Sequence, residues 1–388
     1  MGTSFLEKLL PKYWRKYSGV NDRPLPSSYR ELPRGTDYRR DALLRVSQEL
    51  KVGENVAQEL VRRFPDLEML IGTFRSSYQK FAETGITPDE GYLAFRSLYF
   101  NTQGASNDLI SENLSKTFRK PTIPQTFSSV FGSFIQTDVL RIVRNLRTAG
   151  IAQLESTVGP EHLREFNKAT GFDGSEKGCG VVEETPIRSF VKESSLLSIP
   201  VVNRIAADPL FYFVAGEYLE TQPIFVRPAV WTSRPHSNSY ENLSESAQLF
   251  HVDMSNPKFF QVFLYLNDVD DNNGPHCAIP GTHRAKAREL WRDGRISDEE
   301  MASFYSRDTW RTEKGPAGTL FIVDTVAFHK GLAPVAGERR ICSLYYANTL
   351  FGQHLPVTSD TPAFDPVNFG EQVADFSPRF LSRFASAS

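Results

Sequence analysis

The chain has 388 residues, which is long enough for two or three domains of ordinary size. Hydrophobic residues make up 40% and charged residues 23%, which excludes a collagen-like, low-complexity or wholly disordered chain. Because 44 basic side chains stand against 46 acidic ones, the chain has no overall basic field to recruit nucleic acid. Cys179, Cys277 and Cys342 are too few and too scattered for a disulfide framework, which is typical of a reducing compartment.

No stretch approaches the ~20 uninterrupted apolar residues of a membrane span. The first residues also lack the apolar run and small-residue cleavage site of a secretory signal, and Leu6 breaks the myristoylation pattern. We therefore expect a cytoplasmic protein without a transmembrane segment. The sequence does not indicate its oligomeric state.

Residues 1–145 have a helical pattern. Apolar side chains recur three and four residues apart over 41–50 and 56–64. Further helices are expected over 67–81 and 88–99. We predict that 1–145 forms a helical N-terminal region, whose sequence names no chemistry.

The texture changes in residues 146–356, where short strands alternate with Gly, Pro, Asn and Asp. Several such strands without long helices between them favour an antiparallel barrel or sandwich. One insertion, 285–316, is expected to be partly helical because Ser297 and Glu300 have the spacing of a capping box. Residues 357–388 are read as a C-terminal tail. The strands are expected near 151–157, 224–231, 258–269, 318–324 and 340–348.

A candidate metal site begins with His251 and Asp253, which follow an apolar stretch. On an extended backbone, residues two apart point to the same face, so the imidazole and the carboxylate project together. His329, just after the predicted strand 318–324, is the candidate for a third ligand. Two histidines and one carboxylate on one side of a metal form the facial triad of non-haem Fe(II) oxygenases.

Arginine begins the predicted strand that follows His329. Arg339 and Arg340 stand there, after Gly337 and Glu338. A guanidinium group pairs with a carboxylate through two hydrogen bonds. An arginine beside an open metal site is therefore suited to hold a dicarboxylate.

Four blocks of the sequence resemble the phytanoyl-CoA dioxygenase-like branch of the Fe(II)/2-oxoglutarate oxygenases, in that family's order. They cover roughly residues 150–350, and the part before them matches nothing recognisable. The loop with Asn-Gly and Pro-Gly-Thr-His is the most specific block. The blocks are the opening strand and helix at 150–155 and 159–166, the His-X-Asp at 251–253, the loop at 273–283 and the strand at 318–329.

The resemblance implies a mainly β chain with α, whose core is a double-stranded β-helix, or jelly-roll. It assigns Fe(II) to His251, Asp253 and His329. In the family, the arginine for 2-oxoglutarate usually follows the distal histidine by eleven residues, which selects Arg340 over Arg339. Gln248 lies where family members often place a residue that lines the co-substrate pocket.

One departure from the family's pattern and one residue that keeps to it also bear on the site. A hydroxyl residue two positions after the distal histidine often touches 2-oxoglutarate in the family, and this chain has Gly331 there. Related halogenases replace the carboxylate ligand with Gly or Ala, so Asp253 favours oxygenation. His283 is expected to be structural or to face the substrate, His276 to be a loop residue, and Asp324 to support the loop before His329.

The expected activity is that of a 2-oxoglutarate-dependent dioxygenase, which uses Fe(II), 2-oxoglutarate and O2. It hydroxylates an unactivated C–H bond of a small or conjugated metabolite and releases succinate and CO2. The alternative is a non-oxidative jelly-roll enzyme or binding protein, with zinc or without metal. A third possibility is a degenerate barrel carrying an interaction module, against which the intact triad speaks.

The sequence does not identify the substrate. The insertion after His283 holds more basic than acidic side chains, which suits an anionic substrate or a solvated helix face equally. Arg284 is the candidate substrate contact, because it adjoins the loop that is expected to line the site.

Overall fold

The structure is a computed structural model that describes residues 38–172, 181–184, 187–237 and 239–353. The chain divides into two units, residues 1–44 and 45–388. The elements below belong to the second unit, except for the start of α1. The predicted tail, 357–388, lies outside the described residues.

The helices of the described residues alternate with strands from residue 126 onward. They are α1 (Tyr38–Arg63), α2 (Glu68–Thr84), α3 (Asp89–Asn101), α4 (Ala105–Thr117), α5 (Gln136–Ala149), α6 (Pro160–Thr170), α7 (Glu193–Leu197), α8 (Pro200–Ala206), α9 (Pro209–Leu219), α10 (Tyr240–Glu245) and α11 (Asp298–Phe304). The strands are β1 (Thr126–Ser129), β2 (Gly132–Ile135), β3 (Ile151–Thr157), β4 (Val181–Glu184), β5 (Arg188–Val191), β6 (Ile224–Ser233), β7 (Phe259–Tyr265), β8 (His276–Ala278), β9 (Arg311–Glu313), β10 (Thr319–Val323), β11 (His329–Gly331) and β12 (Arg339–Ala347).

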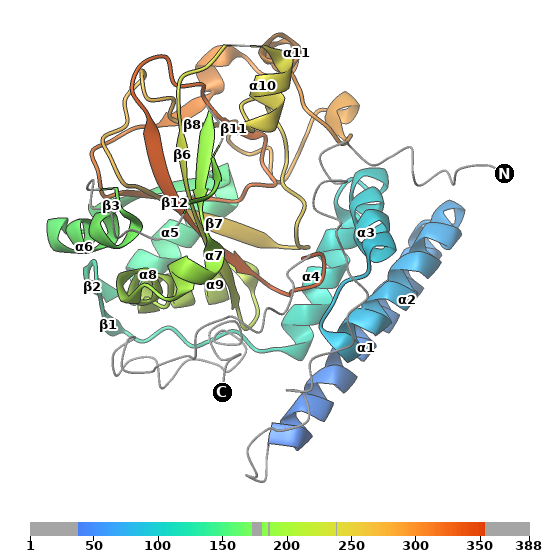
Figure 1. Ribbon diagram of the computed structural model, residues 1–388. Coiled ribbons are helices and arrows are strands. Elements are labelled where there is room, and N and C mark those ends of the chain that lie inside the picture. Colours follow the sequence, from blue (N-terminus) through green and yellow to red (C-terminus); the bar gives the residue numbers. More distant parts are fainter. Residues whose placement is uncertain (1–37, 173–180, 185–186, 238, 354–388) are drawn as a thin grey trace. The chain divides into compact units, whose positions relative to one another are not determined.

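Two antiparallel sheets carry the architecture (Figure 1). The larger sheet has seven strands in the order β3-β10-β7-β12-β6-β5-β4, and the smaller has three in the order β11-β8-β9. Every pairing in them is antiparallel. The predicted mixture of helices and antiparallel strands is thus confirmed.

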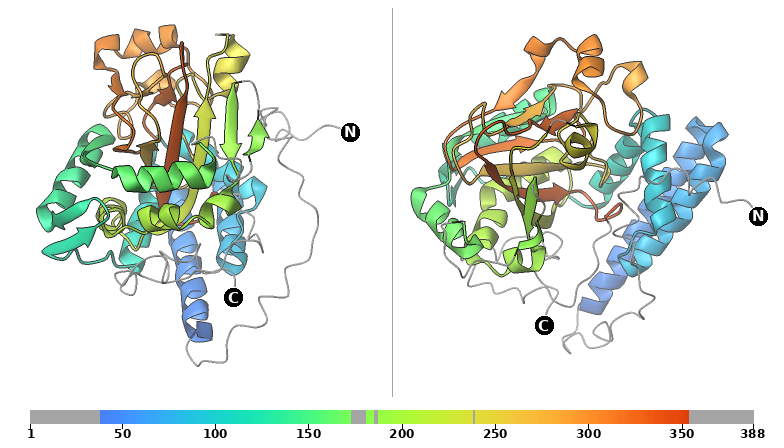
Figure 2. Two further views of the ribbon diagram at one scale, coloured as in Figure 1. Left: turned by 60° about the vertical axis from the view of Figure 1, so that its left-hand side comes forward. Right: turned by 45° about the horizontal axis from the view of Figure 1, so that its top comes forward.

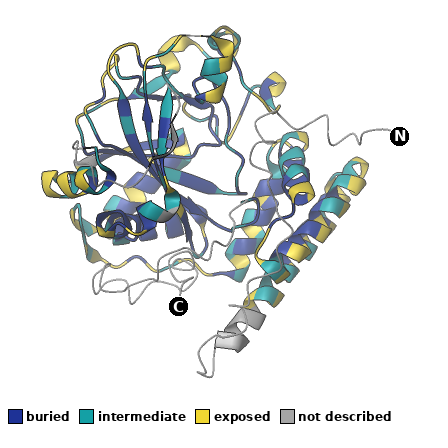
Figure 3. Cartoon of the chain, in the orientation of Figure 1, coloured by how far each residue is buried: buried dark blue, intermediate teal, exposed yellow. Residues whose placement is uncertain are grey.

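Strand β12 divides its side chains between two surroundings. Cys342, Leu344 and Tyr346 belong to the large hydrophobic core, which also includes the buried side chains of α5 and α9. Ser343 and Tyr345 point to the opposite face, because successive residues of a strand alternate, and there they line a pocket. The strands around this core are drawn mostly as buried in Figure 3. The core therefore fixes β12, and the other face of the same strand carries polar groups.

Helices α2, α3 and α4 lie side by side (Figure 2). Four rings from α2 and α3, those of Phe74, Tyr78, Phe81 and Phe95, surround the ring of Phe351 with centroids 4.7 to 5.8 Å away. Phe351 follows β12 in the chain and is fully buried. Helices α2 and α3 therefore share an aromatic core with the segment that follows β12.

The insertion between β8 and β9 contains α11, which begins as its sequence predicts. The Ser297 hydroxyl accepts a hydrogen bond from the backbone N–H of Glu300 at 3.2 Å and caps the helix. In the described part of the chain, no helix is long and apolar enough to cross a membrane.

Candidate metal centre

His251 and His329 lie side by side because their backbones pair directly. Each donates its backbone N–H to the carbonyl oxygen of the other, at 3.1 Å in both directions. The ring centroids are 4.3 Å apart, and both residues are buried. Such an exchanged pair is the closely hydrogen-bonded pair of an antiparallel ladder. It joins two histidines that are far apart in the sequence.

Backbone carbonyls occupy the Nδ1 atoms of both rings. His251 Nδ1 lies 2.9 Å from the carbonyl oxygen of Leu249, and His329 Nδ1 lies 3.0 Å from that of Ala327. A carbonyl oxygen only accepts, so each Nδ1 carries the proton and each Nε2 keeps a free lone pair. Burial, together with the neighbouring His329 ring, holds the pKa of His251 well below its usual range. The two rings therefore present the atoms that a metal ion needs.

Asp253 turns its carboxylate toward both Nε2 atoms. Its Oδ1 lies 3.7 Å from Nε2 of His251, and its Oδ2 lies 3.6 Å from Nε2 of His329. The three ligand atoms are all within 4.8 Å of one another, and the described residues hold no second group of three such side chains. The cluster suits a metal ion, and two imidazoles with one carboxylate match the facial-triad donor set. The structure thus brings together the three ligands that the sequence predicts.

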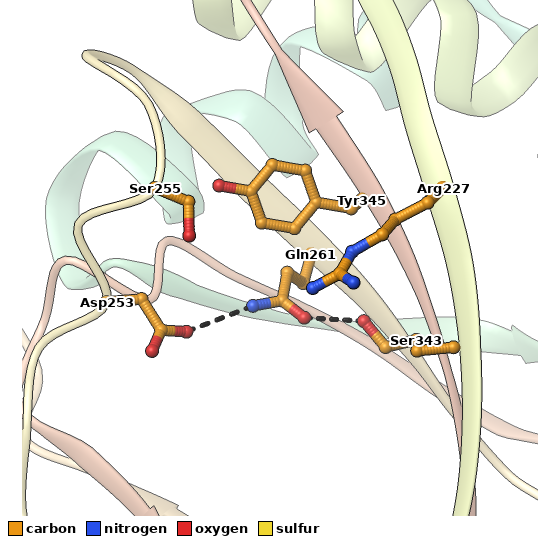
Figure 4. Close-up of a pocket in the computed structure, with 7 residues that line it drawn as sticks. Arg227, Asp253, Ser255, Gln261, Ser343 and Tyr345 are labelled. Carbon is orange, nitrogen blue, oxygen red and sulfur yellow. Dashed lines mark hydrogen bonds between the residues drawn. The ribbon is translucent and has the colours of Figure 1, made fainter. Parts of the chain in front are cut away.

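Gln261 and Ser343 hold the Asp253 carboxylate in place (Figure 4). Gln261, on β7, donates from Nε2 to Asp253 Oδ2 at 3.1 Å and lies 3.2 Å from the hydroxyl of Thr325. Its Oε1 accepts a hydrogen bond from the Ser343 hydroxyl at 2.5 Å. Because a carboxylate oxygen accepts whereas a hydroxyl can donate or accept, the amide turns its donating end to Asp253 and leaves Oε1 to accept from Ser343. Outer contacts of this kind orient metal ligands.

The structure does not bring Arg340 to the metal cluster, which corrects the expectation for that residue. Arg340 lies on the face of β12 that carries the helices. Its guanidinium donates to the carbonyl oxygen of Phe172 at 2.9 Å, lies over the Phe172 ring and pairs with Glu338. The physical reason is strand alternation. The neighbouring Arg339 points to one face of the sheet, so Arg340 must point to the other.

Arg339 faces the opposite way and is buried, with 4% exposure. It shares its face with Ser343, four residues along the same strand. Its Nη1 donates to the carbonyl oxygen of Gly274, and its Nη2 lies 3.4 Å from the Ser233 hydroxyl. No carboxylate of the described residues forms an ion pair with it, and its Nε has no hydrogen-bond partner there. A buried guanidinium group without an anion is costly, so its surroundings suit an anionic ligand.

His276 is a second buried polar side chain without a partner among the described residues, and it lies on β8 rather than in a loop, where the sequence predicts it. On β8 it lies directly opposite Gly331 of β11, and its ring stacks on that of His329 with centroids 5.7 Å apart. It is 5% exposed, and neither ring nitrogen has a hydrogen-bond partner in the described part of the chain. Burial, with His329 and Arg339 nearby, holds its pKa well below the usual range. The neutral ring thus offers one N–H donor.

Gln248 completes this group. It is 2% exposed, and it follows Ala247, whose carbonyl accepts the backbone N–H of Gly331 at 3.1 Å. Its Oε1 lies 2.8 Å from Nε2 of His236, and its Nε2 has no partner among the residues described. Buried polar groups are nearly always hydrogen-bonded in proteins. The unsatisfied atoms of Arg339, His276 and Gln248 therefore indicate a site for a polar ligand around Gly331.

Three other residues from the sequence analysis lie apart from the ligand cluster. His283 has Nε2 3.0 Å from the carbonyl oxygen of Arg147, which is a structural contact. Asp324 accepts from the backbone N–H of Val326 at 3.0 Å and supports the loop before His329, as expected. Arg284 is exposed and does not line the pocket beside Asp253.

Sequence reasoning also missed Gln261, Ser343, Tyr345 and Arg227, which line that pocket together with Asp253. Each stands in a strand among apolar neighbours. The available signal was a polar side chain at the alternating position of an otherwise apolar strand. That pattern indicates that one face of the strand is polar, but the tertiary structure is needed to show which other residues line the same pocket.

Comparison with known proteins finds similar solved structures but no matching family model, and no curated protein matches the chain. Among solved structures, EctD from S. alaskensis with bound Fe gives a TM-score of 0.43 at 19% identity, covering 59% of this chain and 83% of that one. The non-heme alpha ketoglutarate dependent epimerase SnoN, from nogalamycin biosynthesis, gives 0.41 at 13% identity, covering 54% and 83%.

HygX from Streptomyces hygroscopicus, with nickel and 2-oxoglutarate bound, gives a TM-score of 0.41 at 12% identity, covering 57% of this chain and 93% of that one. Scores and identities this low do not carry chemistry from one chain to another. What this chain does must therefore be inferred from its own side chains.

Proposed function

We propose that this chain is an Fe(II)- and 2-oxoglutarate-dependent oxygenase that hydroxylates a C–H bond of a small metabolite. The observation that carries the proposal is a juxtaposition. The His–Asp–His cluster leaves both histidine Nε2 atoms free. Two residues after His329 on β11 comes Gly331, and the buried Arg339 packs against it without an anion among the described residues. A hydrolase has no use for that arginine, whereas a dicarboxylate co-substrate needs it.

The residues fit the two groups that the proposal requires. His251, Asp253 and His329 would hold the ferrous ion on one side and leave its other positions open. Arg339 would bind the far carboxylate of 2-oxoglutarate, the role that the sequence analysis assigns to Arg340. Gln248 and His276, whose buried nitrogens have no partner among the described residues, would donate to the same carboxylate.

When bound, iron and 2-oxoglutarate supply an oxidant derived from O2, with succinate and CO2 as the other products. The chain itself holds the ligands still, through the carbonyls of Leu249 and Ala327 and through the amide of Gln261. Because His251 and His329 are buried, little water reaches their side of the metal, which protects a reactive site from side reactions. The intact Asp253 supports oxygenation rather than halogenation.

The resemblance of the sequence motifs to the phytanoyl-CoA dioxygenase-like branch supports a double-stranded β-helix for the two sheets. The proposed oxygenase reaction, however, is supported by the metal cluster and Arg339. An anaerobic titration with Fe(II) and 2-oxoglutarate tests it directly. We expect a visible charge-transfer band in the wild type and none in His251→Ala. His162→Ala is the matched control, since His162 lies outside the cluster.

The two neighbouring arginines offer a second matched pair. We expect Arg339→Met to weaken 2-oxoglutarate binding by a factor of 30 or more, on the order of the 2 kcal/mol or more lost when one partner of a buried charge pair is truncated. Arg340→Met should change it by less than about twofold, since the guanidinium of Arg340 binds Phe172 and Glu338 instead. Equal effects of the two substitutions would contradict the assignment.

Succinate formation separates this proposal from the non-oxidative alternative. An oxygenase with Fe(II) converts 2-oxoglutarate to succinate, and Zn²⁺ should inhibit it, because zinc competes well for such ligands but lacks redox chemistry. A zinc-activated protein that forms no succinate would be a hydrolase or a binding protein.

A further inference from the structure

The pocket beside Asp253 is the part of the molecule that best indicates the substrate. It encloses about 120 Å³, well below the roughly 300–1,000 Å³ of a site for a drug-sized ligand. A metal ligand forms one of its walls. The pocket therefore takes a compact group of a substrate and holds it next to the metal.

Arg227 supplies the positive charge of this pocket. It lies on β6 directly opposite Tyr345 of β12, and Tyr345 lies opposite Gln261 of β7. Residues opposite one another in register share a face of the sheet, and Figure 4 shows the guanidinium directed toward the other lining side chains. Its ion-pair partner within the described ranges is Glu193, at the long distance of 3.8 Å. Both side chains remain partly exposed, so this pair is weak.

Hydroxyl groups line the rest of the pocket. Ser255, Ser343 and Tyr345 contribute them, and the Tyr345 ring is stacked on Phe259 with centroids 5.0 Å apart. Burial holds the pKa of Tyr345 well above its usual range, so its phenol keeps its proton. Neutral hydroxyls and one guanidinium group suit a polar ligand that carries negative charge.

This positive group is separate from the one proposed for the co-substrate. Arg339 and Tyr345 point from the same face of β12 but are six residues apart, which at ~3.3 Å per residue is roughly 20 Å. A five-carbon dicarboxylate is much shorter than that. The Arg339 guanidinium also stays at its own end of the strand, because its Nη2 lies against Ser233, its register partner on β6, so the two arginines are assigned to different ligands.

Resting on the proposed function, we propose that the substrate carries an oxyanion, a carboxylate or a phosphate, that Arg227 binds in the pocket beside Asp253. The hydroxyls of Ser255 and Tyr345 contact polar groups of the same end of the substrate, while Ser343 keeps its hydrogen bond to Gln261. The substrate class is accordingly a small anionic metabolite, with the carbon to be oxidised close to its charged end. Arg227 replaces Arg284 as the residue that recognises this charge.

The test uses the full chain loaded anaerobically with Fe(II) and saturating 2-oxoglutarate. Acetate, inorganic phosphate and the neutral acetamide are titrated in turn, and the charge-transfer band is recorded together with the heat of binding. We expect at least one of the two anions to bind saturably and shift the band, while acetamide does not. Comparing acetate with phosphate tells which oxyanion the pocket prefers.

Three variants make the result specific. Arg227→Gln should weaken anion binding about tenfold or more, the usual loss for a charged hydrogen bond, and Arg227→Lys should weaken it less. Glu193→Gln should tighten it, since it removes the competing carboxylate. The affinity for 2-oxoglutarate should change less than about twofold in all three. Thermal melts of each variant check that it folds.

The outcomes separate this inference from the proposed function. If the band forms but neither anion binds, or if both bind equally well to Arg227→Gln, the oxyanion site is wrong and the oxygenase stands. The same holds if Arg227→Gln weakens 2-oxoglutarate binding as Arg339→Met does. If no band forms at all, the proposed function fails, while calorimetry still reports on the anion.

Discussion

Arg339 packs against Gly331 so closely that a side chain at Gly331 would displace it. A Cβ added to Gly331 would stand 2.5 Å from Nη2 of Arg339. The atom in the way is the far end of a flexible side chain, and the Gly331 backbone lies outside the left-handed region that favours glycine. The absence of a side chain at this position therefore gives the guanidinium its place beside the metal cluster.

This relationship predicts the effect of Gly331→Ala. The chain should fold, but the guanidinium must shift, so 2-oxoglutarate should bind about tenfold more weakly, as measured by anaerobic titration. In an Arg339→Met background the same change should cost nothing further, because coupled residues are not additive. Gly72→Ala, where an added Cβ meets nothing within 4 Å, is the control. Full additivity of the two substitutions would contradict the arrangement.

Gln261 provides a prediction about metal affinity. Gln261→Leu keeps the size of the side chain but removes the hydrogen bond to Asp253 at 3.1 Å. Loss of such a support typically lowers metal affinity about 10- to 100-fold. Anaerobic competition with a chelator measures the Fe(II) affinity. Ser343→Ala should give a smaller loss in the same direction, because it frees the amide without removing it, and an unchanged affinity in Gln261→Leu would refute the role.

Lys286 predicts how stability depends on pH. It is 9% exposed, its ammonium donates to the Tyr99 hydroxyl at 3.0 Å and to the Thr282 carbonyl at 2.7 Å, and burial lowers its pKa to about 7. The unfolded chain, with a lysine pKa near 10.4, then binds more protons than the folded one above pH 7. Stability must therefore rise with pH in this range.

Between pH 7 and pH 9 this lysine should add about 2 kcal/mol to the free energy of unfolding. Urea unfolding of the metal-free protein at both values measures it. Lys286→Met keeps the apolar stem and should lack the increment, whereas all other titrating groups contribute equally to both proteins. A difference between wild type and variant that does not change with pH would show that Lys286 stays charged.

Phe351 leads to a prediction about how much its contacts with α2 and α3 contribute to the free energy of unfolding. Its fully buried ring lies among four rings of α2 and α3. Phe351→Ala should destabilise the protein by about 3–5 kcal/mol, the usual cost of removing a buried phenylalanine. Phe304→Ala, at a side chain 39% exposed, should cost much less. Urea unfolding compares the two, and equal costs would argue against the shared core.

Local sequence patterns are enough to predict many of the elements and the candidate metal ligands. Apolar spacing places α1, α2 and α3, and the pattern of short strands indicates antiparallel sheets, because both depend on local periodicity. His251 and Asp253 are two apart on an extended segment, so their common face follows from backbone geometry alone. Motif order then supplied His329 from far along the chain.

Which side chains meet depends on long-range strand pairing. The count along the chain favours Arg340, but the pairing of β12 with β6 and β7 turns Arg339 toward Gly331 and Arg340 toward Phe172. A shift of one residue exchanges the two faces of a strand, and a count across a loop does not fix that register. For the same reason the sequence did not show that Arg227, Gln261 and Tyr345 stand in one row, since cross-strand neighbours are set by long-range pairing.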